Sequence, residues 1–501
     1  MTQYIDLMPS PASLIESLRS IGYSLEAAVA DVIDNSVAAH AHLIDIRFSW
    51  NAGLPWLAII DDGSGMAAAE LVTAMRLGSI SPLAIREKDD LGRFGLGLKT
   101  ASFSQCRQLT VLSLKNEQVN CCQWDIDQIT EDESSGWRLR VLESDELQKH
   151  GTLSHLIKEY LDGKRSGTIV LWEKLDRLKE PQSSPKSEAF FDSLMFDVRK
   201  HLELVFHRFL SPEQGARRLT IRMNNDDLEP FDPFNPRNLA TQELPVQTIT
   251  VEGEKIIVQP YVLPHHNKVP TQEYNKYAGD EGYLHNQGFY VYRNRRLIIK
   301  GSWFRLIKKD ELNKLIRVRV DIPNTLDHLW KLDVKKSYAS PPELVRQALQ
   351  QVINKIEGAG RKVYGQRGTG LRPGVTSPVW RRIAINGTIS YEINRDHPLI
   401  AEVLTRSEME NRSHIQHMIK MIENSFPTDV FFNDIAQNPR DISLPTWDEQ
   451  EYEQLVDLFV ETFLSAGAPE NSIARQLLST DPFASNRART ETILMRKGYA
   501  L

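Results

Sequence analysis

The sequence predicts an α+β protein in three parts: an α/β sandwich, a second α/β domain and a mostly helical C-terminal region. The chain has 501 residues, which suggests about three domains at roughly 150 residues each. Helical and strand periodicities alternate over residues 10–175, as expected where helices pack on a sheet. Polar breaks follow at 181–185 and 365–378, where we place domain boundaries.

The composition is that of an ordinary globular protein. Hydrophobic residues make up 41% of the chain and charged residues 25%, which excludes a mainly disordered, fibrous or membrane-embedded protein. The 60 Lys+Arg and 66 Asp+Glu give a net charge of -6, so a surface for nucleic acid would have to be a local patch. Three cysteines are too few for a disulfide framework. With no signal peptide and no membrane span expected, we predict a cytoplasmic protein.

The first part begins with a helix over 13–41 that is interrupted at Gly22. Alternating residues then predict a strand over 43–48, and a continuous apolar run predicts a buried strand over 56–60. A helix at 67–77 and strands at 109–114 and 168–172 follow. This order predicts a sheet with helices packed on it.

The chain changes character near residue 182. Apolar spacing predicts a helix over 188–210, and strands are expected at 248–262 and 288–299. Pro341-Pro342 opens a further helix to about residue 356. The predicted parts are an N-terminal domain over 1–180, a second domain over 186–340, a connecting helix over 341–364, a linker over 365–378 and a C-terminal domain over 379–501, which has a strand-like piece at 380–393.

Polar side chains interrupt the apolar helix that contains Asp31, Asp34 and Asn35. Asp31 and Asn35 are four residues apart and so share a face, with Asp34 beside them. A carboxylate can take a proton from water, and an amide oxygen can ligate Mg²⁺. The alternative is a polar helix face that simply meets solvent.

A second segment, Asp61-Asp62-Gly63-Ser64-Gly65-Met66, follows the buried strand directly. The carboxylate of Asp61 can accept a hydrogen bond from an exocyclic amine, and glycines allow the backbone to approach a flat ligand closely. The alternative is an ordinary Asp/Gly turn after a strand.

A third segment is rich in glycine and runs from Gly92 through Gly95 and Gly97 to Lys99. Glycines at this spacing can present backbone N–H groups to phosphates, with a helix N-terminus behind them. The segment matches neither the dinucleotide-binding fingerprint nor the Walker A spacing.

These three segments, in this order, together resemble the N, DxGxG and GxxGxG boxes of the GHKL superfamily, which has the Bergerat ATPase fold. The resemblance implies a Bergerat-type α/β sandwich ATPase domain over 10–175, followed by a transducer-like α/β domain. It also implies ATP and Mg²⁺ as cofactors, with Asn35 as the metal ligand and Asp61 binding the adenine amine. Thr168 resembles the fourth element of the family. The implied nucleotide-binding residues are Asp34, Asn35, Asp61, Gly63, Gly65, Met66, Gly92, Arg93, Phe94, Gly95, Leu96, Gly97, Lys99 and Thr168.

Two features concern hydrolysis. Asp31 stands where most hydrolysing members have a glutamate general base, and its side chain is one methylene shorter, so slow turnover is expected. Transducer domains of hydrolysing members offer a lysine to the γ-phosphate, and Lys335 or Lys336 would fill this catalytic role here. Solvated surface lysines are the alternative, and the sequence does not separate the two residues.

The segment 292–319 is locally basic and contains Arg293, Arg295 and Arg296, with aromatic residues between the charges. This pattern predicts a surface for the DNA backbone. The alternative is a solvated face of a twisted sheet.

Within the superfamily the motifs are most similar to those of prokaryotic MORC-like ATPases. That resemblance implies an ATP-gated dimeric clamp, with restriction-modification or phage-defence proteins as partners. Two other functions remain open. One is a nucleotide-sensing scaffold that binds ATP and a protein partner with little hydrolysis, and the other is a chaperone-like client binder.

Overall fold

The computed structural model describes residues 10–20, 22–78, 97–131, 137–178, 188–213, 215–330, 341–365, 377–385, 388–428, 431 and 447–499. The chain divides into two compact units, Met1–Arg361 and Lys362–Leu501. In the described part of the chain, no helix is both long and apolar enough to cross a bilayer.

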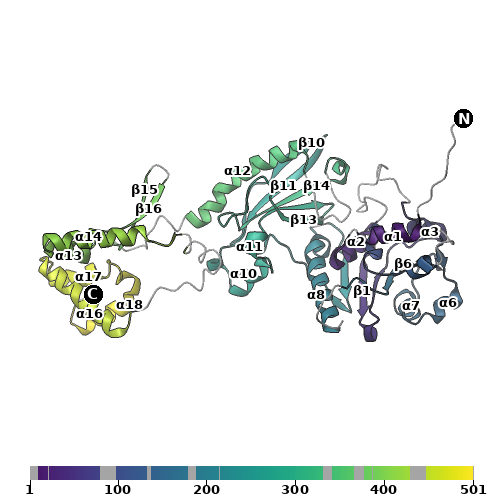
Figure 1. The fold of residues 1–501 in the computed structure, drawn as a ribbon, viewed down its shortest axis with the longest axis horizontal. Coiled ribbons are helices and arrows are strands. Elements are labelled where there is room, and N and C mark those ends of the chain that lie inside the picture. The colour runs from purple at the N-terminus through teal and green to yellow at the C-terminus, as the bar shows by residue number, and fades with distance from the viewer. Residues whose placement is uncertain are drawn as a thin grey trace. The chain divides into compact units, whose positions relative to one another are not determined.

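The first unit contains an eight-stranded sheet in the order β5-β4-β3-β6-β2-β1-β7-β8. Figure 1 labels its strands β1 and β6. Neighbouring strands are antiparallel except for β1 and β7, which are parallel. The strands are β1 Leu43–Ser49, β2 Trp56–Asp61, β3 Gln108–Lys115, β4 Gln118–Asp125, β5 Arg140–Val141, β6 Ser166–Glu173, β7 Thr220–Met223 and β8 Asp226–Asp227. The last two strands extend this sheet beyond residue 180, where the sequence places the end of the first domain.

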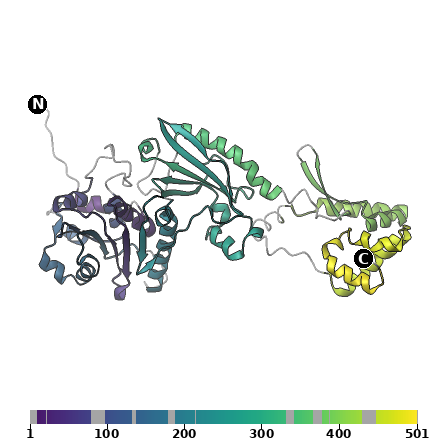
Figure 2. The same ribbon diagram turned by 180° about the vertical axis from the view of Figure 1, so that it is seen from behind.

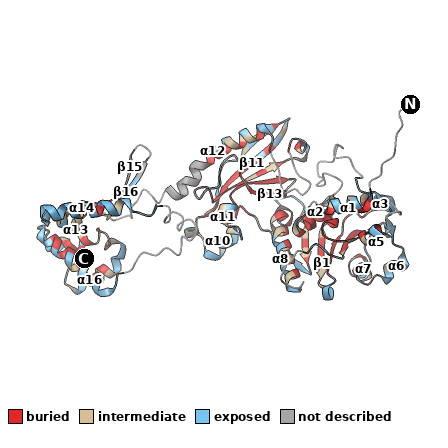
Figure 3. Ribbon diagram, viewed as in Figure 1, coloured by how far each residue is buried: buried red, intermediate tan, exposed pale blue. Residues whose placement is uncertain are grey.

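Helices cover both faces of this sheet because its strands alternate in the direction of their side chains. In β2, Leu57 and Ile59 belong to the core under one layer of helices, whereas Ala58 and Ile60 belong to the core on the other face. The first layer contains α1 Pro11–Arg19, α2 Leu25–Ala38, α4 Gly97–Phe103, α5 Ile126–Glu131, α8 Glu188–Val205 and α9 His207–Leu210, with α3 Ala68–Met75 beside α4. The opposite layer contains α6 Ser144–Lys149, α7 Gly151–Leu156 and the π-helical turn η3 Ile157–Leu161. The strands between them are largely buried (Figure 3).

A second sheet follows in the order β10-β11-β14-β12-β13, with β9 paired to β11. Its strands are β9 Gln242–Glu243, β10 Gln247–Val251, β11 Glu254–Val262, β12 Gly288–Arg293, β13 Arg296–Ser302 and β14 Ile316–Ile322. The helix α12 Glu343–Gly365 lies along this sheet (Figure 2) and buries Val345, Leu349 and Ile353 against it. The short helices α10 Thr271–Ala278 and α11 Gly282–His285 lie between β11 and β12 in sequence.

The second unit has a small hairpin and a helical core. The hairpin is β15 Trp380–Ile385 and β16 Thr388–Ile393, and the helices are α13 Pro398–Arg406, α14 Met409–Asn424, α16 Glu449–Ser465, α17 Glu470–Leu477 and α18 Arg487–Arg496. Tyr452, Phe459 and Phe483 are buried together at its centre. The predicted fold class is confirmed: α/β sheets with helices are followed by a mostly helical C-terminal region.

Candidate nucleotide site

The helix α2 brings the first predicted segment to the sheet. Asp31 and Asp34 are buried, whereas Asn35 is exposed. The hydroxyl of Tyr23 donates to Asp31 Oδ2 at 3.1 Å, and the amide nitrogen of Asn35 donates to the backbone oxygen of Asp31 at 3.2 Å. This helix face therefore combines a held carboxylate with an accessible carboxamide, a donor set that suits Mg²⁺ and a water to be deprotonated.

Asp61 ends β2 and is buried, with 6% of its surface exposed. Ser36 Oγ donates to Asp61 Oδ2 at 2.8 Å, and the N–H of Gly63 donates to Oδ1 at 2.9 Å. Burial raises the pKa of this carboxyl to about 6, and the two hydrogen bonds oppose that rise. Asp61 is therefore mainly ionised at neutral pH and able to accept from an amine.

The loop after Asp61 is shaped by glycine and fixed to β3. Gly65 has φ +65, and a Cβ added there would lie 1.9 Å from the backbone oxygen of Leu114. The next residue, Met66, donates its N–H to Ser113 Oγ at 2.7 Å. A Cβ at Gly63 would lie 2.9 Å from Ala39 Cβ and from Asp61 Oδ1. The glycines are thus required by close backbone approach.

We expect Gly65→Ala to destabilise the protein by about 3 kcal/mol, because it adds a clash with a strand backbone to the cost of a left-handed alanine. Gly78→Ala is the matched control: Gly78 has φ +70, but a Cβ there would meet no atom of the residues that the structure describes within 4 Å. The control should cost only about 1 kcal/mol. Urea unfolding measures both, and equal losses would contradict the close-approach argument.

Thr168 is placed beside Asp61 by strand register, because the two residues are partners in the antiparallel pair of β2 and β6. Its Oγ1 lies 3.2 Å from Ser113 Oγ, and Ser113 is its partner on β3. The structure therefore brings Asp61, Gly63, Gly65, Met66 and Thr168 together. Their roles in nucleotide binding stay predictions.

Ser36 and Ser113 also belong to this cluster, although neither was predicted as a site residue from the sequence. Ser36 directly follows Asn35 in the first predicted segment, a position from which it could have been inferred. Ser113 carries no local signal, because only the pairing of β3 with β6 places it next to Thr168.

The third segment is only partly described. Gly92, Arg93, Phe94, Gly95 and Leu96 lie outside the described residues, as do Lys335 and Lys336. Gly97 begins α4, and Lys99 is buried within it, where its Nζ donates to the backbone oxygen of Ala74 at 2.8 Å. Burial lowers the pKa of Lys99 to about 8. The phosphate-binding roles of this segment stay predictions.

Arg296, the first residue of β13, reaches the helix α2. Its Nε donates to Asp34 Oδ1 at 2.9 Å, and its Nη2 lies 4.0 Å from Asp31 Oδ1. The guanidinium also lies 5.0 Å from the ring centroid of Phe206. The structure gives Asp34 this partner, because a buried carboxylate requires a nearby cation or its equivalent. The role of Asp34 in nucleotide binding stays a prediction.

The pKa of His201 on α8 is affected by the same charges. Burial, followed by the charge of Arg296, lowers the pKa of His201 to about 3. The imidazole is therefore neutral at physiological pH. Arg296, and not His201, supplies positive charge beside Asp31 and Asp34.

The predicted DNA surface requires correction. Arg293 and Arg296 are 5% and 6% exposed, and Arg293 donates through Nε to both oxygens of Asp327 at 2.8 Å. Arg295 lies with its guanidinium 4.6 Å from the ring centroid of Phe209. The first two arginines are buried ion-pair partners rather than surface cations, because β12 and β13 face other parts of the first unit.

Comparison with known proteins identifies the class of this domain. Residues 23–163 match the family described as "Histidine kinase-, DNA gyrase B-, and HSP90-like ATPase". These residues form a domain of the GHKL type, so the resemblance predicted from the motifs is confirmed, and the family supports ATP binding.

The chain is also similar to ATPase morc-1 of Caenorhabditis elegans, with 31% identity over 90 residues. This stretch covers 18% of the present chain and 10% of that protein. The chain therefore spans about a tenth of the length of the curated relative that it matches, and the similarity supports a MORC-like ATPase domain.

Proposed function

We propose that the protein binds ATP with Mg²⁺ in the N-terminal domain and hydrolyses it slowly to ADP and phosphate. The observation that carries this proposal is the buried carboxylate of Asp61, held by Ser36 and Gly63 next to Thr168 and the close-packed Gly65. A buried, ionised acceptor beside a glycine loop suits the exocyclic amine of adenine. The cost of burying such a carboxylate favours a role in binding over an ordinary turn.

The proposed catalytic roles follow from the exposed and buried sides of α2. The exposed carboxamide of Asn35 would hold Mg²⁺, which supplies charge neutralisation for the phosphates. Asp31 would take the proton of the attacking water, with Lys335 or Lys336 stabilising charge on the phosphoryl group. Tyr23 orients the carboxylate of Asp31.

We further propose that nucleotide binding is communicated to the second sheet through Arg296. This residue joins β13 to both carboxylates of α2, so a shift of α2 changes the contacts of the hairpin formed by β12 and β13. This connection suits ATP gating, whereas the dimeric clamp and its restriction-modification or phage-defence partners rest on the MORC-like resemblance alone. The proposal that the clamp acts on DNA rests on the resemblance alone, because Arg293 and Arg296, which were expected to contact DNA, are buried.

The second candidate is a scaffold that binds ATP and a protein partner with little hydrolysis. The specific observation in its favour is the environment of Asp31, whose carboxylate accepts a hydrogen bond from Tyr23 and lies near Arg296. Both groups lie against the carboxylate and compete with an attacking water for its oxygens.

Phosphate release and nucleotide binding by three variants separate these functions. For the ATPase, Asp31→Ala should lower turnover by about 10²–10⁴-fold while ATP still binds, and Asn35→Ala should weaken Mg²⁺-dependent binding. Glu26→Ala, in the first turn of the same helix, is the control and should leave both properties unchanged. A wild type that binds ATP but releases phosphate no faster than Asp31→Ala would instead identify the scaffold.

A further inference from the structure

A buried hydroxyl joins the helix α2 to the carboxylate that we assign to base binding. Ser36 lies on this helix and is 3% exposed. Its Oγ donates to Asp61 Oδ2 at 2.8 Å, although the two residues are 25 positions apart. Alanine would favour the helix at least as well as serine does. The hydroxyl is therefore best explained by the carboxylate that it contacts.

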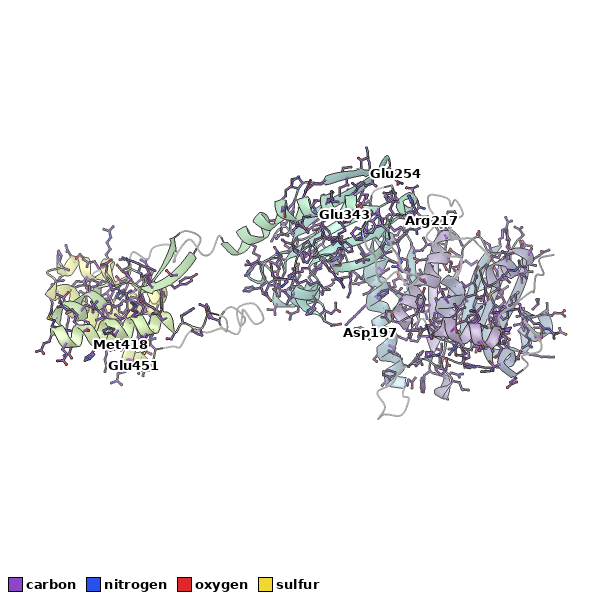
Figure 4. The ribbon with its side chains drawn as sticks, turned by 45° about the horizontal axis from the view of Figure 1, so that its top comes forward. Asp197, Arg217, Glu254, Glu343, Met418 and Glu451 are labelled. Carbon is purple, nitrogen blue, oxygen red and sulfur yellow. The ribbon has the colours of Figure 1, made fainter. Side chains whose placement is uncertain are left out.

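The end of α2 that carries Ser36 is fixed in place. The N–H of Ser64 donates to the backbone oxygen of Ala39 at 3.0 Å, which ties the helix end to the loop after Asp61. Arg217, labelled in Figure 4, donates to the backbone oxygen of His40, just beyond the helix. Because the helix end is held in this way, Ser36 can keep the carboxylate in one orientation.

Both oxygens of the Asp61 carboxylate have a donor within the protein. Ser36 donates to Oδ2, and the N–H of Gly63 donates to Oδ1 at 2.9 Å. Such hydrogen bonds favour the ionised form of a carboxyl over the protonated form. Burial is the largest influence on the pKa of Asp61 and raises it to about 6, whereas the bond from Ser36 is the largest influence that lowers it. The charge of Asp62 also raises this pKa, and hydrogen bonds from the backbone of Gly63 and Thr168 lower it.

The protonation state of this carboxyl decides which purine it can recognise. An ionised carboxylate only accepts hydrogen bonds, whereas a protonated carboxyl also donates one. Adenine offers an exocyclic amine, which is a donor, and hypoxanthine and guanine carry a carbonyl oxygen at the same position. A carboxylate therefore selects the amino purine, and a protonated carboxyl accommodates the oxo purine.

We propose that Ser36 determines base specificity, because its hydroxyl keeps Asp61 an acceptor and so favours an amino purine over an oxo purine. Ser36 acts through Asp61 rather than on the nucleotide, so it is a positioning residue. This role rests on the proposed function, in which Asp61 binds the base. Without the hydroxyl, Oδ2 is free to carry a proton and to donate to the carbonyl oxygen of an oxo purine.

The test compares the affinities of the full-length protein for ATP and for inosine triphosphate, both with Mg²⁺, by calorimetric titration at neutral pH. The base of inosine triphosphate has a carbonyl oxygen where adenine has its amine. The variants are Ser36→Ala, Asp61→Asn and the two combined. Thr110→Val is the matched control, because Thr110 is fully buried in the same sheet and its hydroxyl accepts from Gln123 Nε2 at 2.9 Å.

We expect the wild type to bind ATP more tightly than inosine triphosphate. In Ser36→Ala, the ATP affinity should fall about tenfold, while the affinity for inosine triphosphate should hold or rise. The preference for ATP then shrinks by about tenfold or more, whereas Thr110→Val should keep the wild-type preference. In the Asp61→Asn background, removal of the hydroxyl should leave the preference unchanged, because asparagine has no carboxyl to protonate.

The two nucleotides separate a failure of this role from a failure of the proposed function. If the wild type binds neither nucleotide, the ATP site itself is wrong and the role of Ser36 fails with it. If the wild type binds ATP but does not prefer it, or if Ser36→Ala keeps the preference or weakens both nucleotides equally, the role of Ser36 alone is overturned.

Discussion

Asp61→Asn is expected to weaken ATP binding by about ten- to a hundredfold, the value of a charge-assisted hydrogen bond. The N–H of Gly63 requires an acceptor, so the amide oxygen would face Gly63 and the amide nitrogen would turn to the other side. An adenine amine arriving there would meet a donor instead of an acceptor. Calorimetric titration of the wild type and the variant measures the difference.

The same substitution should not destabilise the protein. The pKa of Asp61 is raised from 3.8 to about 6 in the folded state, so the folded state holds this proton more tightly than the unfolded state does. The free energy of unfolding therefore falls as the pH rises from about 4 to 6, by about 3 kcal/mol in all. Since asparagine avoids this penalty at neutral pH, the variant should melt no earlier than the wild type.

The pKa also predicts how binding depends on pH. If the ionised carboxyl of Asp61 accepts a hydrogen bond from adenine, the ATP affinity of the wild type falls as the pH drops through about 6. Below this pH the loss of affinity approaches tenfold for each pH unit. In Asp61→Asn this component is absent, and the remaining dependence is that of the nucleotide and other groups.

Asp62→Asn provides the matched control for Asp61. The Oδ1 of Asp62 accepts from the N–H groups of His42 and Leu43 at 2.6 and 2.9 Å, so its role is to fix the start of β1. We expect ATP affinity within about threefold of the wild type. Equal losses in the two variants, or an unchanged affinity in Asp61→Asn, would refute the assigned role of Asp61.

Arg296→Gln is expected to destabilise the first unit by about 3–5 kcal/mol, because it removes the guanidinium that pairs with the buried Asp34 and lies beside the buried Asp31. Asp34 and Asp31 are 2% and 5% exposed, so solvent cannot take over this task. Adding Asp34→Asn should restore much of the loss, and a double-mutant cycle in urea measures the coupling free energy, expected at about 1–3 kcal/mol.

The double variant with Arg296→Gln and Asp34→Asn tests whether nucleotide binding at the N-terminal domain is communicated to the second sheet. In the wild type, ATP should alter hydrogen exchange in β12 and β13, whereas the variant with Arg296→Gln and Asp34→Asn should bind ATP without this response. Arg293→Gln with Asp327→Asn removes the ion pair that Arg293 of the same hairpin makes with Asp327 and serves as the control, which should keep the response. A double variant that responds as strongly as the wild type would show that Arg296 is only structural.

Local patterns in the sequence determined the class of the N-terminal domain and most of its elements. Each of these residues lies within or directly beside the element that positions it: the polar residues of α2 in the helix, Asp61 at the end of β2 and Gly65 in the turn that follows. Periodicity and turn chemistry therefore suffice to predict them. The family match over residues 23–163, which include these segments, confirms the predicted class of the domain.

Only the tertiary structure decided which distant residues meet. Arg296 and Asp34 are 262 positions apart, and their contact depends on the strand order that directs the β12–β13 hairpin toward α2. The basic segment was expected on the surface because its composition is charged, yet Arg293 and Arg296 are neutralised by Asp327 and Asp34 from elsewhere in the chain. Composition records the number of charges, whereas strand pairing determines which of them lie opposite one another.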